Sequence, residues 1–223
     1  MIRSLFRMPS SCWEVRAPYS RTVFRRVADR VVAFGAHPDD LEVGAGGILA
    51  RLAREGATVT MVVSSVPNKP AIRKAEAKRG AKLLGVQLEL LDITRLEDMP
   101  MAQLVARFDA IVARHAPDLV ITHSAHDVHW DHVLVHRATV SAVRRTACDL
   151  WSYIAGPLLG GTERRLGQLS ADISATIDAK LAAIAAHASQ GINVEARRAI
   201  ARAMGALAGC EYAEVFEVLR VLV

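Results

Sequence analysis

The sequence predicts an α/β fold with a mostly parallel β-sheet, and three features carry this prediction. Apolar runs of strand length alternate with helix-length segments from residue 31 onward, a pattern typical of βαβ units. The first run, residues 31–36, contains no charged residue, as expected for a strand that is covered on both faces. The chain has 223 residues, of which 52% are hydrophobic, and this suits one domain with a sizeable core.

We expect strands and helices to alternate along the chain, separated by turn residues. The expected strands cover residues 31–36, 58–65, 88–93, 118–121, 150–155, 171–175 and 214–221. The expected helices cover residues 48–54, 71–84, 101–115, 133–143, 177–187 and 194–207. Gly56 closes the first helix, and Pro117 ends the third because the residue before a proline disfavours helical geometry.

An imidazole and two adjacent carboxylates follow the first expected strand directly. His37, Asp39 and Asp40 stand at its carboxyl end, where open α/β sheets keep their ligands. Pro38 fixes its own φ and biases His37 toward an extended conformation. The side chains of His37 and Asp40 are therefore free to turn toward one point, with Asp39 beside them. Neutral imidazole and carboxylate together suit Zn²⁺ or Fe²⁺.

A second cluster of metal-binding residue types follows the fourth expected strand. Five of the eight histidines lie between residues 123 and 136, a density that neither a solvated loop nor a core requires. The order His129, Asp131, His132 offers a third metal ligand, a carboxylate that orients a neighbouring imidazole, and an imidazole free for chemistry. In the first cluster, Asp39 or Asp40 could instead merely N-cap the helix that follows, as a carboxylate at a strand–helix junction commonly does. Two such clusters at two strand ends nevertheless favour a metal site.

Both motifs resemble those of a known family. Residues 36–42 read Ala-His-Pro-Asp-Asp-Leu-Glu, and three glycines and the His129-x-Asp131-His132 triplet follow them. This pattern resembles the LmbE-like or PIG-L family of zinc-dependent N-acetylglucosaminyl deacetylases. Further matches fall at Arg73 with Glu76, Leu84-Gly85, residues 116–118, Asp172-Ile173, Lys180, Ser189-Gln190 and residues 213–216.

The resemblance implies a Rossmann-like three-layer sandwich and a metal-dependent hydrolase. Its substrate would be an N-acetylglucosamine-containing small molecule or glycoconjugate, which loses its N-acetyl group to a metal-activated water. The resemblance assigns His37, Asp40 and His132 as the ligands of Zn²⁺. Fe²⁺ or another divalent metal is an alternative with the same ligands.

The resemblance also implies roles for four residues that do not bind the metal. Asp39 would be the general base, and His129, oriented by Asp131, would stabilise the tetrahedral oxyanion. Either Asp39 or a protonated His129 would protonate the leaving amine. Arg73 would bind substrate, with its guanidinium donating to sugar hydroxyls.

Several residues near the two motifs have two interpretations. His136 lies four residues after His132 and either competes for the metal or, as we favour, packs behind the ligands. The roles of His123 and His126 are open, and Trp130 either stacks on a sugar or wedges the loop. We expect Gly44, Gly46 and Gly47 to let the backbone approach a metal or a sugar closely.

The net charge of +5 lies entirely at the N-terminus, where the first thirty residues contain seven Arg and two acidic residues. We expect residues 1–30 to form a flexible basic extension and residues 31–223 to form one LmbE-like domain. The balanced charge of the domain argues against nucleic-acid binding, and no run of about 18 apolar residues is present to span a membrane. Cys12, Cys148 and Cys210 are widely spaced, which predicts reduced thiols in a cytoplasmic protein.

Three rival functions remain compatible with these residues. A related zinc amidohydrolase would act on another N-acyl group or on a thiol or antibiotic conjugate. A metal phosphoesterase would usually need more carboxylates to hold two metals about 3.5–4 Å apart. A non-enzymatic binding module would have no turnover for Asp39→Asn to change. The expected partner is a small-molecule sugar conjugate, and the oligomeric state stays open, a homo-oligomer included.

Overall fold

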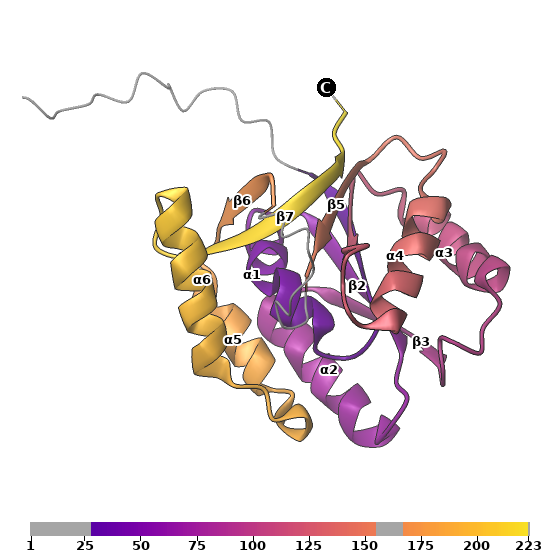
Figure 1. Cartoon of the computed structure of the whole chain (residues 1–223), viewed down its shortest axis with the longest axis horizontal. Helices are drawn as coiled ribbons and strands as arrows, with labels where there is room; N and C mark the ends of the chain where they lie inside the picture. The colour runs from indigo at the N-terminus through magenta and orange to yellow at the C-terminus, as the bar shows by residue number, and fades with distance from the viewer. Residues whose placement is uncertain (1–27, 155–166, 223) are drawn as a thin grey trace, which may run out of the picture.

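The computed structural model describes residues 28–154 and 167–222, which form a three-layer α/β sandwich with helices on both faces of one sheet (Figure 1). The strands are β1 (Arg30–Gly35), β2 (Thr58–Ser65), β3 (Gln87–Ile93), β4 (Leu119–His123), β5 (Asp149–Tyr153), β6 (Leu169–Asp172) and β7 (Ala213–Arg220). The helices are α1 (Asp40–Arg54), α2 (Pro70–Leu84), α3 (Met101–His115), α4 (Trp130–Ala142), α5 (Ile177–Ala185) and α6 (Val194–Ala208), with a 3-10 turn η1 (Ala188–Gln190).

The seven strands lie in the order β3-β2-β1-β4-β5-β7-β6. Strands β1 to β5 pair in parallel, whereas β7 pairs antiparallel with both β5 and β6. The mostly parallel sheet and the Rossmann-like sandwich that the sequence predicts are therefore confirmed.

Alternating side chains of β1 explain why the sheet is covered on both faces. Val31 and Ala33 belong to one buried cluster, together with apolar residues of α1. Val32 and Phe34 belong to the other, where the ring of Phe34 stacks on that of Phe108 in α3 with centroids 4.3 Å apart. Because successive side chains of a strand point to opposite faces, the uncharged strand β1 contributes apolar side chains to the cores on both faces of the sheet.

The chain reverses its direction of travel across the sheet at β1. From β1 it runs outward through β2 to β3, and then returns to place β4 on the other side of β1. The segments that follow β1 and β4 therefore leave neighbouring parallel strands at the same edge. Such a switch point is where open α/β sheets form a ligand crevice.

Helix α1 begins at Asp40, so the prediction that it covers only residues 48–54 is too short, and the three glycines lie inside it. A Cβ at Gly44 would overlap the ring of the buried Tyr153, and one at Gly47 would lie 2.7 Å from Ile173. These contacts give Gly44 and Gly47 a packing role, and the expectation that the glycines approach a metal or a sugar stays a prediction. They let α1 pack closely on its neighbours.

The folded part of the chain begins before residue 31, where the sequence places its start. Ala28 is buried, and the Asp118 carboxylate accepts the backbone N–H groups of Asp29 and Arg30 at 3.2 and 3.0 Å. Arg30 also pairs with Asp118 at 2.8 Å and opens β1. Residues 1–27 of the predicted extension, Cys12 among them, lie outside the described residues.

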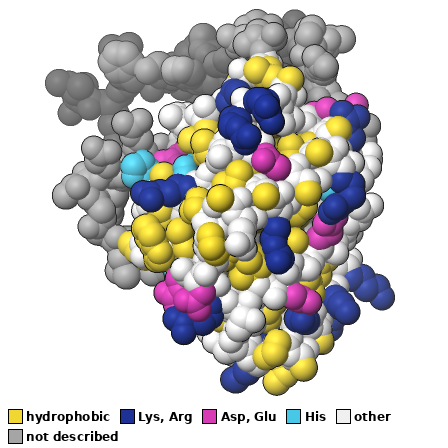
Figure 2. Space-filling view, turned by 90° about the vertical axis from the view of Figure 1, so that its right-hand side faces the viewer, with side chains coloured by type: hydrophobic (Ala, Val, Ile, Leu, Met, Phe, Trp, Pro, Cys, Tyr) yellow, Lys and Arg dark blue, Asp and Glu magenta, His cyan; other side chains and the backbone are white. Residues whose placement is uncertain are grey.

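On the face turned toward the viewer in Figure 2, the Lys and Arg side chains form small, separate groups. No helix among the described residues is both long and apolar enough to cross a bilayer. Cys148 and Cys210 are free thiols.

We predict that Gly44→Ala lowers the free energy of unfolding by about 1–3 kcal/mol, because the added methyl overpacks the Tyr153 ring. Gly46→Ala is the matched control on the same helix, since its Cβ would lie 3.4 Å from Lys180, an ordinary contact. Gly46→Ala should leave the free energy of unfolding unchanged or raise it by about 0.5–1 kcal/mol, because Ala favours a helix more than Gly does. Urea unfolding of both variants measures the difference, and equal effects would contradict the packing role.

Candidate metal centre

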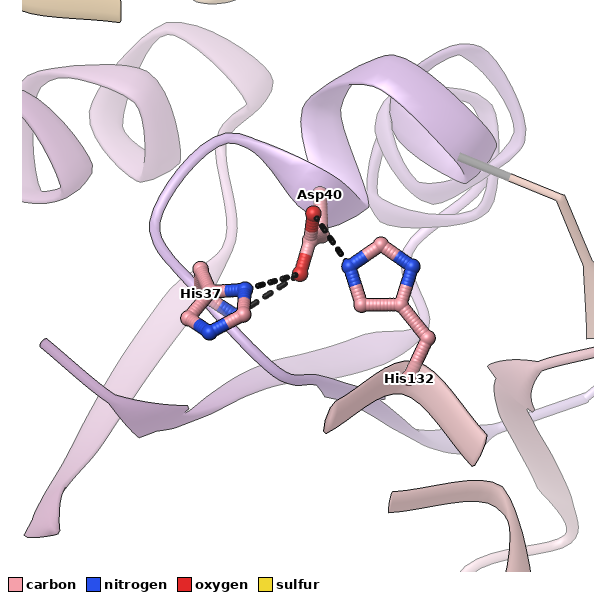
Figure 3. Close-up of side chains that lie close together, drawn as sticks. All are labelled: His37, Asp40 and His132. Atoms are coloured by element: carbon pink, nitrogen blue, oxygen red, sulfur yellow. Dashed lines mark hydrogen bonds and ion pairs between the residues drawn. The ribbon is translucent and has the colours of Figure 1, made fainter. Parts of the chain in front are cut away.

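Two strand ends bring three buried residues together. His37 and Asp40 come from the turn between β1 and α1, and His132 comes from the first turn of α4, after β4. Each residue offers one ligand atom, and these atoms lie within 4.8 Å of one another. Figure 3 shows the Asp40 carboxylate between the two imidazoles. Its oxygens lie 3.6 Å from Nδ1 of His37 and 3.3 Å from Nε2 of His132.

The turn after β1 is built around two different uses of its adjacent aspartates. The backbone N–H of His37 donates to the Asp40 carboxylate at 2.7 Å, which closes the turn. Asp39 has φ 102°, in the left-handed region that non-glycine residues rarely adopt, and its side chain forms no capping hydrogen bond. The alternative that Asp39 merely caps the helix therefore does not hold.

A carboxylate stands behind each of the two imidazoles. Oδ2 of Asp131 lies 2.9 Å from Nε2 of His37, and Oδ2 of Asp127 lies 2.9 Å from Nδ1 of His132. Such outer carboxylates fix the tautomer and orientation of metal-binding histidines. The remaining ring nitrogens, Nδ1 of His37 and Nε2 of His132, are the ones that face Asp40.

The prediction that Asp131 orients His129 is wrong. We expected its carboxylate to orient His129, but it bonds His37 instead, and only the backbone N–H of Asp131 contacts His129, by donating to Nδ1 at 3.2 Å. His129 precedes α4 as its N-cap, whereas Asp131 lies in the first turn of the helix. The Asp131 side chain is thereby directed toward His37 from the neighbouring strand end.

The charges around His37, Asp40 and His132 favour a bound cation. Although burial opposes the charged imidazolium, hydrogen bonds to Asp131 and Asp40 raise the pKa of His37 to about 9. Burial likewise opposes protonation of His132, but Asp127 and Asp40 raise its pKa to about 10. Burial also disfavours the charged Asp40, yet the neighbouring histidines hold its pKa well below the usual value. The negative charge of the carboxylates, which raises the pKa of both histidines, also attracts a divalent cation.

The spacing of the three residues fits a metal ion. Ligand atoms of a tetrahedral zinc are about 3.3 Å apart when the metal–ligand bonds are about 2.0–2.1 Å. Nε2 of His132 lies 3.3 Å from Oδ1 of Asp40, and Nδ1 of His37 lies 3.6 Å from Oδ2 of the same carboxylate, so each pair is close to this value although the two pairs use different oxygens. A second group of possible ligands, His123 with Asp127 and His132, fits less well. Nε2 of His123 already accepts the backbone N–H of Ala36 at 3.0 Å, and this ring is fully buried.

A cavity of about 350 Å³ opens over the first group. Its walls include every residue to which the family resemblance assigns a metal-binding, catalytic or substrate-binding role except Asp131, which stands behind His37. The lining residues are His37, Asp39, Asp40, Val43, Pro67, Asn68, Arg73, His129, His132, Gln190, Ile192 and Arg197. The two motifs, more than 90 residues apart in the chain, therefore form one site.

Arg73 holds the turn that carries Asp39. Its Nη2 donates to the carbonyl of Pro38 at 2.9 Å and lies 3.4 Å from Oδ1 of Asp39. Its Nη1 donates to the side chain of Asn68 at 3.3 Å. Burial and the charge of Asp40 raise the pKa of Asp39 to about 7, and the Arg73 guanidinium opposes this rise. Arg73 thus steadies Asp39 as well as lining the cavity.

His129 is placed as a hydrogen-bond donor. Because Nδ1 accepts the N–H of Asp131, the neutral ring carries its proton on Nε2. Burial, with the nearby charges of His132 and His37, lowers the pKa of His129 and so favours this neutral form. The ring stacks on that of His132 with centroids 4.6 Å apart, at the wall of the cavity.

Sequence reasoning missed Asp127, although it lies within the second cluster. Its Oδ1 accepts the backbone N–H of His129 at 3.0 Å, while its other oxygen faces His132. Aspartate side chains commonly accept the backbone N–H two residues further on, in an Asx turn, so the position of Asp127 before His129 was a signal available in the sequence.

The residues with open interpretations fall outside the cavity wall. Nδ1 of His136 lies 2.7 Å from the carbonyl of His123, which agrees with the packing role that we favour. The Trp130 side chain is 53% exposed, with the Arg137 guanidinium 5.6 Å from its ring centroid. His126 is exposed.

Sequence comparisons identify a family and its relatives. The family model PIG-L, described as GlcNAc-PI de-N-acetylase, matches residues 32–143. An uncharacterized deacetylase of Escherichia coli is 31% identical over 127 residues, which cover 51% of this chain and 68% of that protein. A probable N-acetyl-alpha-D-glucosaminyl L-malate deacetylase of Bacillus cereus is 30% identical over 176 residues, which cover 69% of this chain and 80% of that protein.

Solved structures share the fold. A conserved protein of Thermus thermophilus superposes with a TM-score of 0.76 at 27% identity, covering 88% of this chain and 96% of that one. The N,N'-diacetylchitobiose deacetylase of Pyrococcus horikoshii has a TM-score of 0.74 at 21% identity, with 86% and 84% covered. The 4-carboxy-2-hydroxymuconate hydratase of Pseudomonas putida has a TM-score of 0.79 at 21% identity, with 87% and 98% covered. A hydratase and a deacetylase thus share one fold, and the reaction must be argued from the site.

We predict that Asp127→Asn weakens zinc binding about 10- to 100-fold, because His132 loses the carboxylate that orients its ring. Competition with a chromophoric chelator measures the dissociation constant. Asp98→Asn, at a side chain that is 68% exposed, is the control and should bind zinc as the parent does. Equal affinity of Asp127→Asn and the parent would show that Asp127 has no part in metal binding.

Proposed function

This chain belongs to the PIG-L family and is an N-deacetylase, and we propose that it removes the acetyl group from an N-acetylglucosamine-containing small molecule or glycoconjugate. One observation carries the proposal. His37 and His132 face Asp40 across one cavity, and a carboxylate stands behind each imidazole. The family match spans all of these residues.

The chemistry of the donor set favours zinc. When held by His37, Asp40 and His132, a divalent cation would lower the pKa of a bound water from about 15.7 toward 7 and polarise the amide carbonyl. We propose Zn²⁺ because two imidazoles and one carboxylate leave a position open, as in catalytic zinc sites. Fe²⁺ or another divalent metal would use the same three residues.

The residues around the ligands supply the proton transfers. In our proposal the Asp39 carboxylate accepts a proton from the water as its oxygen adds to the amide carbon. The Nε2–H of His129 donates to the oxyanion that forms, a contribution worth about 3–4 kcal/mol for one donor in other hydrolases. The C–N bond then breaks as Asp39 passes the proton it took from the water to the leaving nitrogen. His129 could serve as this acid only when its ring is protonated, and the neutral ring described above acts as a hydrogen-bond donor instead. The products are acetate and a free amine.

Two further features complete the proposal. Arg73 would bind the sugar from the cavity wall, although most of its donors already hold Pro38, Asp39 and Asn68. The free thiols of Cys148 and Cys210 suit a protein of the reducing cytoplasm.

The first prediction of this proposal concerns metal removal. Protein loaded with Zn²⁺ should release amine from at least one member of a panel of N-acetylglucosamine conjugates, and protein stripped by a chelator should release none. Fluorescamine labelling of the product measures the amine. Metal-independent release would exclude the mechanism, and release only from other N-acyl compounds would move the substrate to another amide class.

The second prediction concerns the general base. Asp39→Asn should lower kcat about 10²–10⁴-fold, because the amide cannot accept the proton of the water. Its zinc content should equal that of the parent, since Asp39 is not one of the three clustered ligands. Full activity of the metal-loaded variant would contradict the role of Asp39.

The third prediction concerns oxyanion stabilisation. His129→Ala should lower kcat about 10²–10³-fold with a smaller change in KM, because the donor acts mainly in the transition state. His126→Ala is the matched control from the same loop, with an exposed side chain that does not line the cavity. Similar kinetics for the two variants would remove His129 from the mechanism.

A further inference from the structure

A second cavity adjoins the metal cavity. It has a volume of about 540 Å³, in the range of small-molecule sites, and lies between α6, β7 and the start of α1. Figure 1 shows α6 and β7 side by side at one end of the sheet. Val43, Ile192 and Arg197 line both cavities, so the two spaces meet at these residues.

The buried polar groups in this second cavity are already paired. Lys180 donates to Glu214 at 2.6 Å and to the carbonyl of Val43 at 2.7 Å. Glu214 also accepts the backbone N–H groups of Gly47 and Ile48 at 2.7 and 2.8 Å.

Glu217 is satisfied in the same way, since it accepts the hydroxyls of Ser124 and Ser152 at 2.7 and 2.8 Å. With these groups paired, the surface offered to a ligand is mainly apolar. It consists of Val43, Ile192, Ile200, Ala201, Met204 and Val215.

Arg197 is the exception, and it stands where the two cavities meet. Its side chain is half-buried, and its guanidinium forms no hydrogen bond or ion pair with any residue in the described ranges. Within the described part of the chain, the one charge that acts on this guanidinium from nearby is the Asp39 carboxylate, which is not hydrogen-bonded to it. A partly desolvated guanidinium with no hydrogen-bonded partner favours an anionic oxygen from a ligand, ideally a planar acid that takes two of its donors.

We propose that the two cavities form one extended substrate site, in which Arg197 binds an acidic group and the second cavity holds an apolar chain of the same substrate. This inference rests on the proposed function and names its substrate class. The substrate is an N-acylated amino sugar that carries an acid and an extended apolar group. The apolar group belongs either to the aglycone or to a long acyl chain, and the experiment distinguishes these two sources.

Binding is tested first, without reliance on activity. Metal-stripped protein is titrated in a calorimeter with decanoate and with neutral decyl β-glucoside, both below their micelle concentrations. We expect one site per chain for each probe. Arg197→Gln should weaken decanoate about tenfold, as expected for one charge-assisted contact, and change decyl glucoside less than twofold. Ala196→Phe, which fills the cavity from an exposed position on α6, should weaken both probes at least tenfold.

Matched controls come from the same helix. Arg202→Gln and Ala203→Phe change exposed residues that do not line the cavity, and both should bind like the parent. Absence of binding by the parent, or variants at positions 196 and 197 that bind like these controls, would overturn the proposal.

Turnover then identifies the source of the apolar group. Zinc-loaded protein is assayed with three compounds: the methyl glycoside of N-acetylglucosamine, the N-acetylglucosamine glycoside of 2-hydroxydodecanoate, and N-decanoylglucosamine. The second compound carries its carboxylate beside the glycosidic bond, where Arg197 stands, and its chain can extend into the second cavity. A higher kcat/KM for the second compound assigns the cavity to the aglycone, and a higher value for the third assigns it to the acyl chain. In either case Ala196→Phe should reduce the ratio of kcat/KM for the favoured compound to kcat/KM for the methyl glycoside.

The outcomes separate this inference from the proposed function. Turnover of the methyl glycoside with no gain from either chain would overturn the extended site and leave the deacetylase intact. Binding of decanoate that depends on Arg197, without turnover of any compound, would instead refute the substrate class of the proposed function and retain the binding site.

Discussion

One buried carboxylate organises the functional end of this protein. Asp40 accepts the N–H of His37 at 2.7 Å, and it lies 3.3–3.6 Å from three imidazoles, those of His37, His123 and His132. A buried charge is costly unless it is paired. Its position in the first turn of α1 helps, because the helix N-terminus favours a negative charge. The turn after β1 and the start of α4 converge on Asp40 and supply the partners of this buried charge.

The sheet makes this convergence possible. β1 and β4 are parallel neighbours, so the residues that follow them emerge at the same edge. The two cores hold this arrangement from both faces, with Leu49 of α1 on one side and Phe108 of α3 on the other. The histidines are thus placed by burial of apolar surface far from the chemistry, and a metal would enter a site whose ligands are already assembled.

The antiparallel end of the sheet serves a different purpose. Glu214 of β7 and Lys180 of α5 both contact the backbone of α1, which ties the last strand to the helix that carries Asp40. This buried pair also belongs to the wall of the second cavity.

The sequence by itself determined the element types, the parallel sheet and the two strand ends that carry ligand residues, because hydrophobic period and ligand chemistry are local properties. It did not determine which carboxylate supports which imidazole. The contact of Asp131 with His37 joins residues 94 positions apart, and only the packing of β1 beside β4 creates it. The packing role of Gly44 and the unpaired Arg197 between two cavities have the same cause. Each depends on which distant side chain occupies the adjacent space, and tertiary structure alone decides that.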